Sequence, residues 1–193
     1  TSTTSYVSPS ILYIKKTRFK LFSQLNIMAS MTTRKKQDFK NDDHYNTTKD
    51  MWESISHLIP KDKILFEGFM KDNYSSKSVL ILRELGFDVV GDPTIDFFGE
   101  IPKYDILISN PPYSIKKKIF ERLSVLNKPF ILILPISTIT KQFTKCLERD
   151  KLQMIIPSKR MQFEKADIPL SRCWFDCCYL CYKMNLERDI TFI

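Results

Sequence analysis

The chain has 193 residues, 43% of them hydrophobic, which is enough for one domain with a sizeable core. It has no run of about 18 apolar residues, so we expect neither a membrane span nor a membrane partner. The formal net charge is +8, but residues 1–37 contain seven lysines and arginines and no acidic residue. The remaining residues are therefore nearly neutral, and the basic charge belongs mostly to the N-terminal segment.

This N-terminal segment is also rich in serine and threonine, a composition typical of organelle transit peptides. The chain begins with Thr1, and Met28 and Met31 are both plausible starts. Three interpretations stay open: a transit peptide, an upstream extension or tag, and a basic arm that contacts nucleic acid. We expect residues 1–37 to be a disordered extension and residues 38–193 to form a single domain.

In chain order, the hydrophobic pattern predicts a helix over 43–58, a strand over 63–67, a helix over 75–85, strands over 87–90 and 104–108, a helix over 115–126, a strand over 130–134, a helix over 137–149, and strands over 153–156, 160–163 and 173–183. Asn46 or Thr47 could cap the first helix, and Gly86 ends the second. Alternating strands and helices followed by a run of strands predict an α/β fold. We expect a Rossmann-like, mostly parallel sheet of seven strands, with helices on both sides and a C-terminal antiparallel hairpin.

The most informative motif is Asn110-Pro111-Pro112-Tyr113, which directly follows the expected strand over 104–108. Each proline fixes its own φ near −65° and restricts the residue before it, so the loop is stiff. The side-chain oxygen of Asn110 and the carbonyl oxygen of Pro111 can both accept hydrogens from one NH2 group. Tyr113 offers a flat face beside them. The alternative is a plain turn that ends the strand.

Other polar residues follow neighbouring strands, and ligands of open parallel sheets bind beyond the carboxyl ends of the strands. Glu67 and Gly68 follow the first strand, Asp92 follows the second, and Asp96 with Phe97 comes shortly after. Glu67 could accept from an amine, Asp92 could hold ribose hydroxyls, and Asp96 could accept from an adenine amine while Phe97 covers its ring. S-adenosylmethionine carries all of these groups. Each residue also has a simpler interpretation: Glu67 as a solvated strand end, Asp92 as a turn former and Asp96 as a helix cap.

Four of the five cysteines gather near the C-terminus, and the full set is Cys146, Cys173, Cys177, Cys178 and Cys181. On a strand, Cys173, Cys177 and Cys181 share one face and Cys178 points to the other. A tetrahedral zinc site cannot gather ligands from both faces of one strand, so we expect buried thiols and no metal. Free thiols are typical of a reducing, intracellular compartment.

The motifs together resemble a known family, the adenine-N6 DNA methyltransferases with an Asn-Pro-Pro-Tyr motif, which are S-adenosylmethionine-dependent. Within it, the chain is similar to small phage and giant-virus members. The similar segments are 85–87 leading into 96–98, 104–114, 128–135 and 174–175, and the resemblance spans about 45–182. It implies the Rossmann-like methyltransferase fold and S-adenosylmethionine as cofactor.

The resemblance also implies roles for single residues. The implied catalytic residues are Asn110, Pro111, Pro112 and Tyr113. The implied cofactor contacts are Tyr45, Thr48, Glu67, Gly68, Phe69, Asp92, Asp96 and Phe97. Phe163 falls near the aromatic residue that helps to stack the extruded base. One departure is the missing second glycine after Gly68, where Asn73 could adopt the left-handed geometry instead; a weakened or lost cofactor site is the alternative.

The expected substrate is N6 of adenine in DNA, with Tyr113 stacking on the base and Lys116 contacting a phosphate. Lys116, Lys117 and Lys118 could equally be a solvated helix face. RNA bases, protein glutamine, and a catalytically inactive methyltransferase-fold protein that binds nucleic acid or a partner are the alternatives. The chain leaves little room for a target-recognition domain, so a partner subunit could supply target recognition. Organellar or nuclear localisation is expected if the N-terminal segment is a targeting signal.

Overall fold

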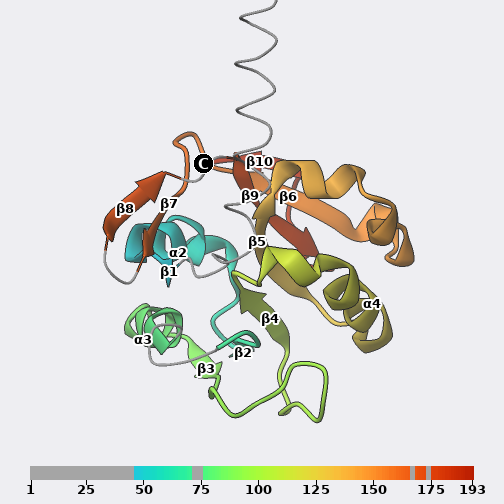
Figure 1. Cartoon of the computed structure of the whole chain (residues 1–193), viewed down its shortest axis with the longest axis horizontal. Helices are drawn as coiled ribbons and strands as arrows, with labels where there is room; N and C mark the ends of the chain where they lie inside the picture. The colour runs from blue at the N-terminus through green and yellow to red at the C-terminus, as the bar shows by residue number, and fades with distance from the viewer. Residues whose placement is uncertain (1–45, 71–75, 166–167, 173–174) are drawn as a thin grey trace, which may run out of the picture. The chain divides into compact units, whose positions relative to one another are not determined.

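The computed structural model describes residues 46–70, 76–165, 168–172 and 175–193. All of them belong to a compact unit that begins at Asp43 (Figure 1). The N-terminal extension expected over 1–37 lies outside the described residues, so its disorder and its boundary stay predictions.

The main sheet has seven strands in the order β10-β6-β9-β5-β4-β2-β3 (Figure 1). Its strands are β2 (Ile64–Phe66), β3 (Asp88–Val90), β4 (Ile106–Ser109), β5 (Phe130–Pro135), β6 (Leu152–Ile156), β9 (Cys177–Tyr182) and β10 (Ile190–Phe192). The four strands β3, β2, β4 and β5 are parallel to one another, and β6 is parallel to β10. β9 runs antiparallel to both of its neighbours, β5 and β6. The expected Rossmann-like α/β class, with a mostly parallel sheet of seven strands, is confirmed.

β6 and β9, which correspond to the expected strands over 153–156 and 173–183, pair antiparallel in the main sheet. A second, smaller sheet contains another antiparallel hairpin. Its strands are β1 (Asn46–Thr47), β7 (Gln162–Lys165) and β8 (Ile168–Arg172), in the order β1-β7-β8. The sequence pattern missed β8, whose Pro169 argues against a strand. It also missed β10, which has three residues and is defined by its pairing with β6.

The helices are α2 (Lys49–Ile55), which continues as the 3-10 turn η1 (Ser56–Leu58), α3 (Ser76–Glu84) and α4 (Lys116–Leu126). The expected capping of the first helix is wrong: Asn46 and Thr47 form β1, and the N-cap is Thr48, without a side-chain cap.

The expected helix over 137–149 is also wrong. The chain instead forms short 3-10 turns, η3 (Ile136–Thr140), η4 (Gln142–Cys146) and η5 (Arg149–Lys151). Thr140 Oγ1 donates to the Ser137 carbonyl at 2.9 Å, and Thr144 Oγ1 donates to the Lys141 carbonyl at 2.7 Å. Such local side-chain bonds compete with regular helix formation, and β-branched residues lower helix propensity further.

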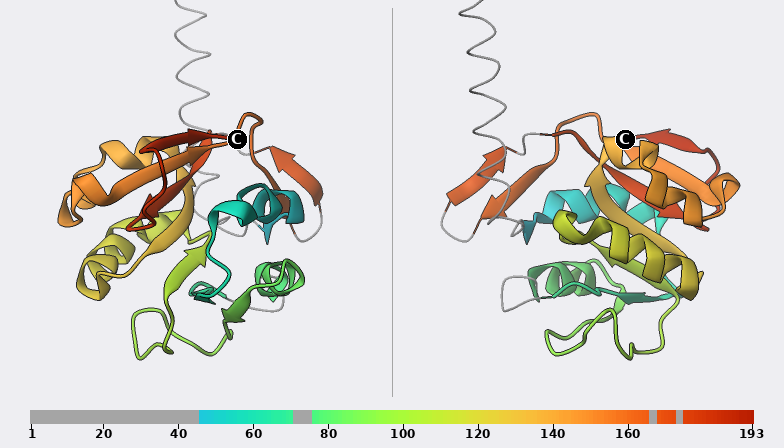
Figure 2. Two further views of the ribbon diagram at one scale, coloured as in Figure 1. Left: turned by 180° about the vertical axis from the view of Figure 1, so that it is seen from behind. Right: turned by 45° about the vertical axis from the view of Figure 1, so that its right-hand side comes forward.

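Side chains on β5 alternate between two hydrophobic clusters on opposite faces of the sheet. Ile131 and Ile133 belong to the cluster that holds residues of α2 and α3, whereas Leu132 belongs to the cluster that holds residues of α4. Figure 2 shows α2 and α3 on one side of the strands and α4 on the other. Both faces are therefore covered, which explains why β5 is apolar throughout.

The thiols on β9 follow the same alternation. Cys177 and Cys181 lie in the cluster with α2 and α3, and Cys178, between them in the strand, is also buried. Burial raises the pKa of the Cys178 thiol to about 11. The expectation of buried thiols is confirmed for these three residues; Cys146 is exposed, and Cys173 lies outside the described residues.

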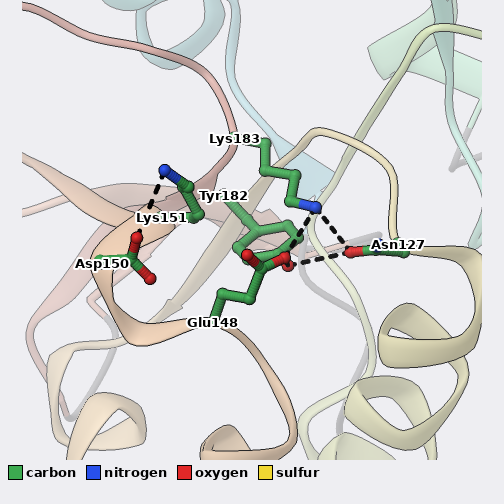
Figure 3. A network of polar contacts seen from close by, with 6 residues as sticks. All are labelled: Asn127, Glu148, Asp150, Lys151, Tyr182 and Lys183. Atoms are coloured by element: carbon green, nitrogen blue, oxygen red, sulfur yellow. Dashed lines mark hydrogen bonds and ion pairs between the residues drawn. The ribbon is translucent and has the colours of Figure 1, made fainter.

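A polar network ties α4 and β9 together at the end of the sheet where β5 begins (Figure 3). Asn127 caps the end of α4 in the left-handed conformation, with φ of 50°. Its Oδ1 accepts from Lys183 Nζ at 2.8 Å and lies 3.0 Å from the Tyr182 hydroxyl. Lys183 also pairs with Glu148 at 2.8 Å, and its hydrogen bond, followed by that of Tyr182, lowers the pKa of Glu148. These contacts connect the end of α4 to the end of β9.

Candidate active site

Residues that follow β2, β3 and β4 leave the sheet at the same edge. Phe66 is paired with Val90 on β3 and with Leu107 on β4, so these parallel strands end side by side. The Glu67 amide donates to the Val90 carbonyl at 2.9 Å. The sequence motifs after these strands are therefore neighbours in the structure.

Glu67 is a buried carboxyl at this edge, with 4% of its surface exposed. Its Oε1 accepts a hydrogen bond from the Ser109 hydroxyl and another from the Phe69 amide at 3.2 Å. Burial raises the pKa of Glu67 to about 7, although both hydrogen bonds favour the charged form and oppose this shift. Its simpler interpretation as a solvated strand end is wrong.

Gly68 is tightly packed, with little room for a side chain. A Cβ at this position would lie 3.0 Å from Leu107 Cδ1 and 3.0 Å from Phe97 Cδ2. Phe97 is itself buried, with 2% of its surface exposed, and its ring centroid lies 4.5 Å from that of Phe69. The ring expected to cover an adenine is thus held in the core, whereas the neighbouring Phe98 is 41% exposed.

Asp92 and Asp96 both shape turns. Asp92 Oδ1 accepts from the Thr94 amide at 2.8 Å and from the Thr94 hydroxyl at 2.6 Å, and these bonds lower the pKa of Asp92. Asp96 Oδ1 accepts from the Phe98 amide at 2.9 Å. Both carboxylates are exposed, so their expected contacts with ribose and adenine stay predictions.

The loop after β4 is held by Tyr113. The Tyr113 hydroxyl donates to Asn110 Oδ1 at 3.0 Å and lies 3.7 Å from Cys177 Sγ. Its ring packs edge-on against Phe175, with centroids 5.4 Å apart. Pro111 is buried and Asn110 is partly exposed. Phe175 and Cys177 therefore lie next to the Asn-Pro-Pro-Tyr motif. The sequence analysis did not predict these contacts.

Three lysines begin the helix that follows this loop. Lys116 Nζ lies 5.2 Å from the centroid of the Tyr113 ring, and Lys117 lies 3.9 Å from Glu121. The first turn of α4 contains no acidic residue. Positive charge there opposes the helix dipole, whereas the ion pair of Lys117 with Glu121 partly offsets this effect.

Phe163 lies in the core rather than at the surface. It is fully buried in the cluster with α2 and α3 and is paired with Thr47 and Ser171 in the small sheet. A base could reach it only if these strands moved, so its expected stacking role stays a prediction without support.

The N-terminal residues expected to contact the cofactor are described in part. Tyr45 and Asn73 lie outside the described residues, while Thr48 is partly exposed at the start of α2. The adjacent Thr47 hydroxyl is buried and has no hydrogen-bond partner among the described residues.

A cavity of about 410 Å³ lies at the opposite, amino-terminal edge of the sheet. Its lining includes Lys63, Lys128 and Lys183. Lys63 pairs with Asp62, Lys183 pairs with Glu148, and Lys128 donates to the Tyr104 carbonyl at 2.7 Å. We assign this cavity no ligand.

Within the described ranges, no three histidine, cysteine or acidic side chains are grouped as metal ligands would be. None of the helices in this part of the chain is long and apolar enough to span a bilayer.

No protein-family model matches the chain, and no curated protein matches it. Among solved structures, it is similar to precorrin-6y C5,15-methyltransferase from Geobacter metallireducens GS-15, with 10% identity and a TM-score of 0.40, over 73% of this chain and 93% of that one. It is also similar to TrmN from Thermus thermophilus, with 9% identity and a TM-score of 0.35, over 70% of this chain and 48% of that one. Both TM-scores are below 0.5, so the function proposed below rests on the residues of this chain.

Proposed function

We propose that the protein is an S-adenosylmethionine-dependent methyltransferase that methylates N6 of adenine in DNA. The observation that carries the proposal is the proximity of two loops: the Asn-Pro-Pro-Tyr loop leaves β4 directly after Ser109, whose hydroxyl contacts Glu67 in the loop after β2. A methyl donor held by one loop would lie beside an amine held by the other.

The residues at the strand ends fit the proposed cofactor. Both hydrogen bonds described for the Glu67 carboxyl end on Oε1, so Oε2 is the oxygen that we assign to an ammonium group. The exposed carboxylates of Asp92 and Asp96 have the right chemistry for ribose hydroxyls and an adenine amine. When bound, the cofactor supplies an electrophilic methyl group.

Asn110 and Pro111 are assigned to the target amine. An amide oxygen can accept two hydrogen bonds; Asn110 Oδ1 accepts one from the Tyr113 hydroxyl, and we assign the same oxygen to an N–H of the substrate. The Pro111 carbonyl would accept the second N–H. Two acceptors on one amine favour a pyramidal nitrogen and stabilise the positive charge that develops there. Neither is a strong base, so the proton leaves late, to solvent.

The lysines of α4 support a nucleic acid as substrate. Lys116, Lys117 and Lys118 follow the catalytic loop directly and can contact phosphates next to the target base. In duplex DNA the adenine must first leave the helix, which costs a few kcal/mol. The domain is small, and we propose that a partner subunit contributes to recognition of the target sequence.

The test is methyl transfer from labelled S-adenosylmethionine to pools of DNA, RNA and protein, with calorimetry of cofactor binding alongside. We expect label in DNA as N6-methyladenine. Label confined to RNA or to protein glutamine would replace the proposed substrate, and failure to bind the cofactor would indicate an inactive methyltransferase-fold protein.

A further inference from the structure

We propose that Ser109 is a positioning residue that ties the Glu67 carboxyl to the strand end carrying Asn110, and so fixes the acceptor of the target amine relative to the methyl donor. The inference rests on the proposed function, because it concerns the distance between the two substrates. Ser109 itself touches neither of them.

The Ser109–Glu67 contact joins β2 and β4 beyond the point where their backbones pair. The last residues in register are Phe66 and Leu107. Ser109 lies two residues further along β4, where it is still paired with Leu132 of β5. β5 therefore holds Ser109 in place, and the side-chain hydrogen bond connects the loop after β2 to that fixed point.

Glu67 connects to three parts of the site. Its amide is bonded to the end of β3, its Oε1 accepts from the Phe69 amide in its own loop, and the same oxygen accepts from Ser109 at the end of β4. The Glu67 carboxyl therefore connects the loop after β2, where we propose that the cofactor binds, to Ser109. Asn110 is the next residue, so binding of the cofactor and the position of Asn110 are linked.

Stability alone does not account for this buried polar pair. β4 is otherwise apolar, with Ile106, Leu107 and Ile108 all buried, and Ser109 breaks this run at its last residue with 1% of its surface exposed. An apolar residue would extend the core there, whereas a buried carboxyl carries a desolvation cost. A hydrogen bond that connects the loop after β2 to the end of β4 explains why a polar pair is buried here.

The protonation of Glu67 offers a readout that does not depend on activity. Its pKa is determined by burial, opposed first by the Ser109 hydrogen bond and then by the Phe69 amide. The described charged groups on neighbouring elements are Asp88 and Asp92 on and after β3, Asp96 in the next loop, Lys49 on α2, Lys77 and Arg83 on α3, and Lys116 on α4. The shift itself follows from burial and the two hydrogen bonds. Removing the Ser109 hydroxyl should therefore raise the pKa of Glu67.

The experiment compares Ser109→Ala, Ser109→Thr and, as a control, Ser124→Ala at a partly exposed position of α4. Carboxyl carbon NMR of the full chain labelled in glutamate follows the titration of Glu67 without any ligand. We expect Ser109→Ala to raise the pKa of Glu67 by about one unit, and Ser109→Thr and Ser124→Ala to keep the wild-type value. Methyl-transfer assays should show kcat reduced by about 100-fold in Ser109→Ala, because small misplacements have effects of this size.

Ser109→Cys keeps the shape of the side chain, is somewhat larger and is a weaker donor, so it provides the same test if Ser109→Ala does not fold. An unchanged Glu67 titration in both variants would overturn the link between the two residues. A shifted titration with wild-type kcat would overturn the positioning role. If the wild-type protein neither binds the cofactor nor transfers methyl groups, the proposed function fails and the positioning role fails with it, while NMR still decides whether the two residues are linked.

Discussion

At the scale of single residues, Asn110 is the centre of the proposed chemistry. Because its Oδ1 accepts from the substrate amine only in catalysis, we predict that Asn110→Ala lowers kcat by about 10²- to 10³-fold. The dissociation constant of S-adenosylmethionine should stay within about twofold, because Glu67 and the loop after β2 are unchanged. Single-turnover methyl transfer and calorimetry measure the two effects. Wild-type turnover in this variant would contradict the mechanism.

Tyr113 combines two functions that substitutions can separate. Tyr113→Ala removes the ring, and base stacking of this kind contributes about 1–3 kcal/mol, so KM for DNA should rise at least several-fold. Tyr113→Phe keeps the ring but loses the hydrogen bond to Asn110 Oδ1. Its KM should stay close to wild type while kcat falls, because the Asn110 amide is less well oriented. Steady-state kinetics distinguish the two variants, and equal effects on KM would argue against stacking.

We predict that Glu67 makes both the stability of the protein and its affinity for the cofactor depend on pH. Its pKa is about 7 in the folded protein, against 4.5 as its ordinary value, so the folded state binds more protons between these two values. Stability therefore falls as pH rises from about 4.5 to 7 and is constant above. Glu67→Gln should recover about 3 kcal/mol at pH 8 and little at pH 4. Denaturant unfolding at both pH values tests this, and equal stability changes at both would contradict it.

The carboxylate form of Glu67 is the one that attracts an ammonium group. Affinity for S-adenosylmethionine should therefore increase as pH rises through about 7, and Glu67→Gln should remove this dependence. Calorimetry between pH 6 and pH 8 would show the trend, and a flat profile in the wild-type protein would argue against an ammonium contact at Glu67.

At the scale of elements, the start of α4 is the expected contact with DNA. Lys116→Gln should weaken DNA binding for all sequences and reduce the slope of log K against log salt by about one. The matched control is Lys103→Gln, an exposed lysine just before β4, at the other end of the strand. Fluorescence anisotropy at several salt concentrations measures both. Equal slopes for the two variants would indicate that the lysines of α4 form a solvated helix face.

The helix α4 also shows how position in the fold determines stability. Phe120 is fully buried between β5 and η4, where its ring contacts Phe130 and Phe143. Phe120→Ala should lower the free energy of unfolding by about 3–5 kcal/mol. Val125, on the same helix but 76% exposed, should tolerate alanine within about 0.5 kcal/mol. Urea denaturation compares the two, and similar losses would mean that the burial pattern is wrong.

Elements with a strong periodic pattern were predictable from the sequence. The apolar run of β5 and the helix that ends before Asn127 follow directly from periodicity and length. The segment after β5 was not predictable in this way, because its helical spacing of apolar residues is opposed by local hydrogen bonds from Thr140 and Thr144. β10 carries too few residues for any local signal.

At the scale of the whole molecule, the order of strands brings the site together. β4 lies between β2 and β5, so the loop containing Asn110 is placed next to the loop containing Glu67, 43 positions earlier in the chain. The proximity of these two loops was predicted from the sequence, because ligands bind at the carboxyl ends of parallel strands. The sequence could not predict which side chains at that edge face the core.

The α/β class, the parallel strands and the position of the Asn-Pro-Pro-Tyr loop could be predicted from the amino-acid pattern, because periodicity and proline act over a few neighbouring residues. The burial of Phe97 and Phe163, the turns held by Asp92 and Asp96, and the contact between Ser109 and Glu67 became visible in the folded chain. These outcomes depend on contacts between residues far apart in the chain. Burial and hydrogen-bond partners are properties of such contacts, and no local pattern contains them.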